Sequence, residues 1–110
     1  MTETNMLRKM SLPTNRRPTT PGEMLVQEFL EPMGISQADF ARRLNVSYVR
    51  LNEIVNGRRA VTPDTALRFA RALGTTPQFW LNGQRNVDLW DVLHDKGKEI
   101  RAIKPLPHAS

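Results

Sequence analysis

The side chains best suited to recognising another molecule lie in one short stretch, residues 47–55. Ser47 is a typical helix cap, and Leu51, Ile54 and Val55 recur at the spacing of an inward helix face. The outward side chains are then Tyr48, Val49, Asn52 and Glu53, with Arg50 on a flank. This set offers hydrogen-bond donors, acceptors and one ring, without a nucleophile paired to a base. Its chemistry is therefore recognition rather than bond cleavage.

Each outward residue also has a simpler interpretation. The Tyr48 ring could fill the core, but the inward face is already occupied, which favours a role in a DNA groove. Asn52 could read adenine through both amide groups or be an ordinary solvated residue. Glu53 could accept a hydrogen bond from cytosine or pair with Arg50 or another arginine. The primary interpretation of Asn56-Gly57 is a helix end, and a phosphate contact from its amides is the secondary one.

A second predicted helix precedes this one and must hold it in place. It runs from a cap at Ser36 to about Leu44. The connection that follows, Asn45-Val46, is short, and Asn tolerates the left-handed conformation that such a tight turn needs. The small Ala41 would let the following helix cross closely. Such a pair of helices projects its second member into the major groove of DNA.

The charge pattern agrees with a polyanionic partner. The net charge is +5, and residues 42–59 carry five arginines against one acid, Glu53. Gln37 and Ser47 begin helices, where amides face phosphates, and Arg58 and Arg59 follow the second helix. A scattered, solvated charged surface would give the same composition, so charge alone leaves both interpretations open.

Three further helices are predicted around this pair. The first begins at Thr20-Pro21 with Glu23 completing a capping box, and its buried stripe is Val26, Phe29, Leu30 and Met33. The next begins at Thr62-Pro63-Asp64 and ends at Gly74, with Ala66, Phe69, Ala70 and Leu73 inward. The last begins at Thr76-Pro77, bends or splits at Gly83, and ends at Gly97. No segment has a convincing strand pattern.

These elements predict an all-α fold: a five-helix domain that contains a helix-turn-helix, with a C-terminal helix and flexible termini. We expect a flexible basic arm over 1–19, the DNA-binding domain over 20–75, a dimerising helix over 76–96 and an extended tail over 97–110. Trp80 and Trp90 are expected in the core or at a dimer contact rather than in a ligand site.

Several functional classes are disfavoured. The chain contains no cysteine, which excludes disulfides and zinc-thiolate sites and fits a reducing cytoplasm. His94 and His108 lack nearby acidic partners, and Asp88 with Asp91 lacks a second carboxylate pair, so we expect no metal, no cofactor and no enzyme activity. No apolar run approaches the roughly 20 residues of a membrane span.

The order of these motifs resembles a known family. Ile35-Ser36-Gln37-Ala38-Asp39-Phe40-Ala41 through Asn56-Gly57-Arg58-Arg59 is similar to the repressor-type (XRE, or Cro/C1) helix-turn-helix family. The continuation through residues 61–70 and 73–81 to Asp88-Leu89-Trp90 resembles its HigA-type antitoxins, also called VapI-like. The resemblance covers about residues 18–93.

The resemblance implies a homodimeric repressor of its own operon, with a palindromic double-stranded DNA operator and a RelE-like toxin ribonuclease as partners. It implies base-reading by Ser47, Tyr48, Val49, Asn52 and Glu53. Phosphate contacts are expected from Gln37, Arg50, Asn56, Arg58 and Arg59. The dimer would use Phe79, Trp80, Leu89, Trp90 and Leu93. A solitary regulator, or a toxin-neutralising module with little DNA binding, remains the alternative.

Overall fold

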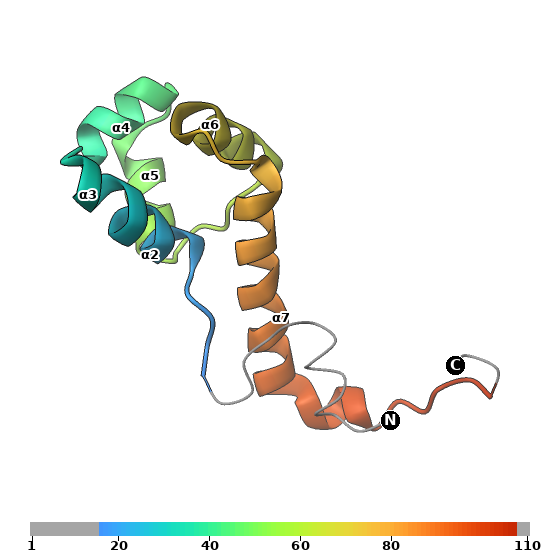
Figure 1. Ribbon diagram of the computed structural model, residues 1–110. Coiled ribbons are helices and arrows are strands. Elements are labelled where there is room, and N and C mark those ends of the chain that lie inside the picture. The colour runs from blue at the N-terminus through green and yellow to red at the C-terminus, as the bar shows by residue number, and fades with distance from the viewer. Residues whose placement is uncertain (1–15, 108–110) are drawn as a thin grey trace. The chain divides into compact units, whose positions relative to one another are not determined.

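The computed structural model describes residues 16–107, which are helical with short connections and contain no strand. The elements are α2 (Pro21–Leu25), η1 (Val26–Leu30), α3 (Glu31–Met33), α4 (Gln37–Leu44), α5 (Tyr48–Val55), α6 (Pro63–Leu73) and α7 (Pro77–Arg101) (Figure 1). Because α2, η1 and α3 follow one another without a break, they form one helix, and the five-helix all-α prediction is confirmed. Residues 1–15 of the expected arm and 108–110 of the expected tail lie outside the described residues.

The chain divides into two compact units. Residues 19–85 form one, and among the described residues the second combines 16–18 with 86–107. The first unit contains every helix from α2 to α6 and the first turns of α7. The predicted DNA-reading residues therefore belong to a single unit.

Side-chain caps set the helix starts in this unit where the sequence places them. Thr20 and Glu23 form a reciprocal capping box, while Ser36 and Ser47 each accept a backbone N–H of their own helix, at 3.1 and 3.0 Å. Asn45 takes the left-handed conformation, with φ of 59°, directly after α4. The connection between α4 and α5 is thus the short turn that the sequence predicts.

The first helix departs from its predicted face. Met33 is 53% exposed, whereas Leu25 and Leu30 are buried and Val26 and Phe29 only partly so. The cause is the π-helical turn η1, in which the Glu31 N–H donates to the Val26 carbonyl five residues earlier. Pro32 explains this turn, because proline has no N–H and its ring clashes with the carbonyl four residues before it. The wider turn shifts the helical phase and leaves Met33 in solvent.

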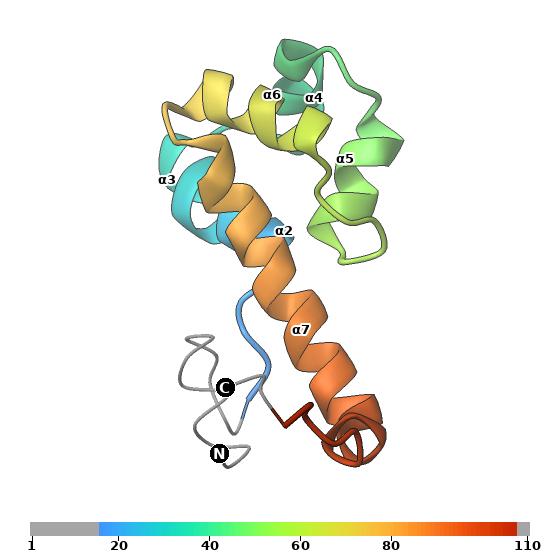
Figure 2. The same cartoon turned by 90° about the vertical axis from the view of Figure 1, so that its right-hand side faces the viewer.

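The core of the first unit is an aromatic cluster surrounded by aliphatic side chains. Trp80 lies 5.0 Å from Phe69 and 5.5 Å from Phe29 between ring centroids, and Phe69 lies 5.9 Å from Phe40. Leu51 and Ile54 of α5 and Ala41 of α4 are buried in the same cluster. In Figure 2, α6 runs beside α4, which closes the core from that side.

Helix α7 differs from its prediction at Gly83. Its backbone stays helical across Gly83 and leaves helical geometry only at Lys96, so the predicted bend at Gly83 is wrong. The predicted end at Gly97 coincides with this break at Lys96, and a second helical stretch continues from there to Arg101. A Cβ on Gly97 would meet only the far end of the flexible Arg101 side chain, at 2.7 Å, which can move aside. Within the second unit, Arg17 forms two hydrogen bonds to the Asp91 carboxylate, at 2.8 and 2.9 Å.

Candidate nucleic-acid interface

The first turn of α5 presents the most exposed of the predicted reading residues. Tyr48 and Val49 are 51% and 66% exposed, although both are large enough to pack in a core. On the opposite side of the helix Leu51 and Ile54 are fully buried. The helix therefore offers a ring and an apolar side chain to a partner, and the inward placement of Tyr48 is excluded for this chain.

A chain of three amides crosses from α4 to α5. The Asn52 Nδ2 donates to the Gln37 Oε1 at 3.1 Å, and the Asn56 Nδ2 donates to the Asn52 Oδ1 at 3.1 Å. An Asn amide has two hydrogens and two acceptor lone pairs, so each end of Asn52 keeps one free for a further partner. We call Gln37, Asn52 and Asn56 the amide relay. It fixes the orientation of Asn52 before any ligand binds.

Glu53 and Arg59 form an ion pair beside the relay. The Arg59 Nη2 lies 2.9 Å from the Glu53 Oε1, and its Nε lies 3.3 Å from the same oxygen. Of the two interpretations of Glu53, the structure therefore shows the pairing with an arginine. The Arg58 side chain is exposed and forms no hydrogen bond or ion pair with residues 16–107, which leaves its guanidinium open to an anion.

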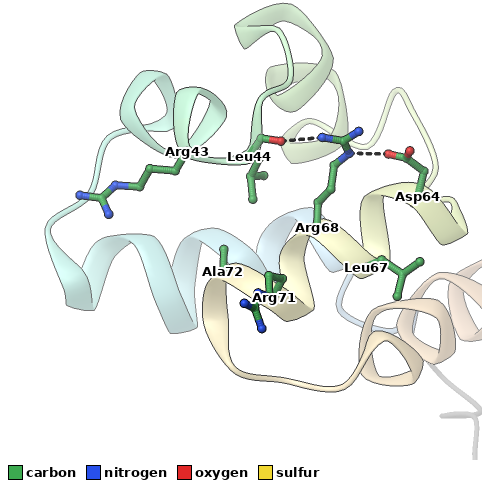
Figure 3. Close-up of a pocket in the computed structure, with 7 residues that line it drawn as sticks. All are labelled: Arg43, Leu44, Asp64, Leu67, Arg68, Arg71 and Ala72. Carbon is green, nitrogen blue, oxygen red and sulfur yellow. Dashed lines mark hydrogen bonds and ion pairs between the residues drawn. The ribbon is translucent and has the colours of Figure 1, made fainter.

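Arg50 is directed toward α6 instead of outward. Its Nη2 donates to the Thr65 Oγ1 at 2.8 Å and to the Asp64 Oδ1 at 3.1 Å. Asp64 also accepts from the Arg68 Nε at 2.6 Å, and the Arg68 Nη1 donates to the Leu44 carbonyl at 2.7 Å (Figure 3). We call Arg50, Asp64, Thr65, Arg68 and the Leu44 carbonyl the Asp64 network.

The charges in this network reinforce one another. Hydrogen bonds from Arg68 and then from Arg50 hold the pKa of the Asp64 carboxyl below its usual value. The same contact with Asp64 raises the pKa of Arg68. The network directs the Arg50 side chain toward α6, away from the exposed side chains of Tyr48 and Val49.

Sequence reasoning missed the Asp64 network. Asp64 was expected only as an acid near a helix start, and Arg68 had no expected role. The spacing of four residues between them is a known signal for an ion pair on one helix face. No sequence signal links Arg50 or Leu44 to this pair, because those contacts exist only once three helices meet.

The predicted dimer residues do not share one environment. Trp80 is 1% exposed, packs against Phe29, Phe69 and Phe79, and donates its indole N–H to the Thr75 Oγ1 at 2.7 Å. It is a core residue and is not available to a second copy, which corrects that assignment. Phe79 is 42% exposed, and the other three are partly buried in the second unit. These three are Leu89, Trp90 and Leu93.

Two other kinds of site are missing from the part of the chain that the structure covers. Its histidines and acids form no group of three that could hold a metal ion. None of its helices combines the length and the apolar character that crossing a membrane requires. Its buried side-chain nitrogen and oxygen atoms all have a hydrogen-bond partner, so it contains no buried polar group awaiting a ligand.

Comparison with known proteins agrees with this geometry. The helix-turn-helix family HTH_3 matches residues 26–80. Antitoxin HigA-1 of Vibrio cholerae is 45% identical over 84% of this chain and 88% of its own length. Virulence-associated protein I of Dichelobacter nodosus is 46% identical over 88% of this chain and 92% of its own length.

A solved structure described as Pseudomonas aeruginosa antitoxin HigA with higBA promoter is also similar. It is 42% identical, with a TM-score of 0.78 over 82% of this chain and 99% of that one. Residues 26–80, which match the family HTH_3, include α4, α5, α6 and the core residue Trp80. The chain therefore belongs to the helix-turn-helix family HTH_3, in its group of HigA-type antitoxins.

Proposed function

We propose that this chain is a sequence-specific DNA-binding repressor that controls its own operon as the antitoxin of a toxin–antitoxin pair. The observation that carries the proposal is the outward first turn of α5, with Tyr48 and Val49 in solvent and the amide relay behind them. The similar HigA that was solved with its promoter supports DNA as the partner. An enzyme activity forms no part of the proposal.

The proposed contacts divide into base-reading and phosphate-binding residues. Tyr48, Val49, Asn52 and Ser47 would meet base edges, with Glu53 contributing only if it leaves Arg59. Gln37, Asn56, Arg58 and Arg59 would contact phosphates. Arg50 is removed from the phosphate set because the Asp64 network engages it.

Fluorescence anisotropy with a labelled duplex from upstream of the gene tests the DNA-binding part. The proposal expects operator binding at least about 1,000-fold tighter than binding to a scrambled duplex, with affinity falling steeply as salt rises. Equal affinity for both duplexes would refute sequence-specific repression.

The toxin partner is tested separately. We expect a small basic ribonuclease encoded beside this gene, and stoichiometric co-purification of the two proteins. Operator binding without such a neighbour would identify a solitary regulator. Toxin capture without operator binding would identify a protein-interaction module.

The proposed repressor acts as a homodimer. Two copies of α5 would lie about 34 Å apart, one turn of the duplex, and would read the two halves of a palindrome. Footprinting of the promoter would show two protected half-sites at that spacing, whereas one protected half-site would contradict the dimer.

A further inference from the structure

One carboxylate connects the three helices that surround the reading surface. Asp64, in the first turn of α6, accepts hydrogen bonds from Arg50 of α5 and from Arg68 of its own helix. Arg50 is further fixed by the hydroxyl of Thr65, which is itself buried. The side of α5 is therefore held against the start of α6.

Arg68 extends the same connection to α4. Its Nη1 donates to the carbonyl of Leu44, the last residue of α4, at 2.7 Å (Figure 3). Carbonyls in the last turn of a helix lack partners within the helix, so a guanidinium there is a favourable cap. Through Arg50 and Arg68, Asp64 thus reaches both helices of the helix-turn-helix.

The network lies in solvent, which limits its effect on folding. The Asp64 side chain is 57% exposed, and a hollow of about 420 Å³ opens beside it, lined also by Arg43, Leu67 and Arg71. Exposed ion pairs contribute little to the free energy of unfolding. Their directional hydrogen bonds still join α5 to α6, and α6 to the end of α4.

We propose that Asp64 is a positioning residue for operator recognition, which holds α5 at the angle that its base contacts require. The proposal rests on the DNA-binding function above. Base contacts need side chains placed to within a fraction of an ångström, while phosphate contacts tolerate small shifts. Loss of Asp64 should therefore reduce specific binding selectively.

The sign of the effect separates positioning from charge. Replacing Asp64 by Ala makes the chain more positive by one unit, so electrostatics alone predicts tighter binding to every duplex. Positioning predicts weaker binding to the operator. The two explanations give opposite results in a single titration.

Asp39 provides a matched control. It is also an acid in the first turn of a helix, its side chain is 52% exposed, and it pairs with an arginine, Arg42. That pair lies within α4 and connects no second helix. D39A therefore repeats the changes in charge and helix-end interaction without releasing α5.

The experiment compares the full-length wild type, D64A, D64E and D39A on operator and scrambled duplexes. We expect D64A to lose operator affinity by about tenfold, comparable to one lost base contact, while its affinity for the scrambled duplex stays the same or rises. D64E should recover part of the loss because it keeps the carboxylate. D39A should lose no operator affinity.

A measurement without DNA keeps this inference separate from the proposed function. Amide hydrogen exchange of residues 51–55, whose N–H groups are hydrogen-bonded along α5, should be faster in D64A than in D39A, because α5 is held less firmly. If the wild type fails to bind its operator, the function is wrong, and the exchange data still test the network. If D64A matches D39A in exchange and in operator affinity, the positioning role is overturned.

Discussion

Asn52 shows how single side chains prepare the reading surface. Its amide is oriented by Gln37 on one side and Asn56 on the other, so it loses little rotational freedom on binding. Arg58 is the opposite case, since its exposed guanidinium forms no contact with the described residues and is free to find a phosphate. The two residues therefore predict different effects of substitution.

Asn52→Ala should relax recognition at one base position and cost roughly 1–3 kcal/mol of operator binding there. Asn56→Ala should produce part of this effect because it removes the donor that fixes the Asn52 oxygen. A set of operators with each base pair changed in turn measures the loss. Equal weakening on operator and random DNA would contradict a base-reading role for Asn52.

Arg58→Ala should weaken binding to all duplexes alike, because a phosphate contact carries no sequence information. The slope of log affinity against log salt should become shallower by about one. Salt titrations on operator and scrambled DNA provide the measurement. An unchanged slope would show that Arg58 does not meet a phosphate.

At the scale of elements, close contact between helix backbones holds the reading helix from behind. Gly22 of α2 lies against the end of α5, where a Cβ would stand 2.3 Å from the Ile54 carbonyl oxygen and 2.7 Å from the Val55 Cα. Gly83 of α7 is also helical, but a Cβ there would meet only the Pro21 Cγ at an ordinary 3.5 Å. Substitution by alanine should therefore have opposite effects on stability at the two glycines.

Gly22→Ala should destabilise the fold by about 1–3 kcal/mol or more, because backbone atoms cannot move aside as a flexible side chain can. Gly83→Ala should stabilise the fold by about 0.5–1 kcal/mol through the lower chain entropy of alanine in the unfolded state. Thermal unfolding followed by circular dichroism measures both changes. Equal midpoints for the two variants would refute the close approach of α2 to α5.

At the scale of the whole molecule, carboxylate ion pairs recur in both units. The pKa of Asp64 is lowered by hydrogen bonds from Arg68 and Arg50, and the pKa of Asp91 is lowered mainly by the hydrogen bond from Arg17. Because folding lowers both values, these groups stabilise the native state above their unfolded pKa of about 3.9. That contribution disappears as the pH falls through the lowered native values.

The unfolding temperature should therefore fall between about pH 5 and pH 2, and part of this fall should come from Asp64 and Asp91. Asn at either position no longer titrates, so Asp64→Asn and Asp91→Asn should flatten the curve of unfolding temperature against pH. Asp95→Asn, which changes an exposed acid that forms no ion pair with residues 16–107, serves as the control. An identical acid slope in all variants would contradict the two ion pairs.

Assembly also belongs to the whole molecule. Leu89 and Leu93 lie four residues apart on α7 and remain partly exposed, as an association surface requires. Leu89→Asp should shift the protein toward monomer in analytical ultracentrifugation and weaken operator binding at low protein concentration. A variant that keeps the wild-type mass and affinity would refute Leu89 as a contact of the proposed dimer.

Local sequence determined most of the element boundaries. Caps at Thr20, Ser36, Ser47 and Thr62 act through atoms within three residues, so helix starts can be predicted without a fold. The inward stripe of α5 follows the helical period in the same way, which confirms the outward prediction for Tyr48 and Val49. Met33 is an exception to the predicted inward stripes, because the π-helical turn before Pro32 shifts the helical phase and leaves its side chain exposed.

Tertiary structure decided how the polar side chains are used. The sequence left two possible partners for the Arg50 side chain, a DNA phosphate or an acidic side chain of the protein. Only the approach of α6 brings Asp64 and Thr65 within 3.1 Å of its guanidinium. Trp80 likewise became a core residue because Phe29 and Phe69 reach it from distant segments. A long side chain binds whichever partner the fold brings near, and that choice depends on contacts between helices that no local pattern encodes.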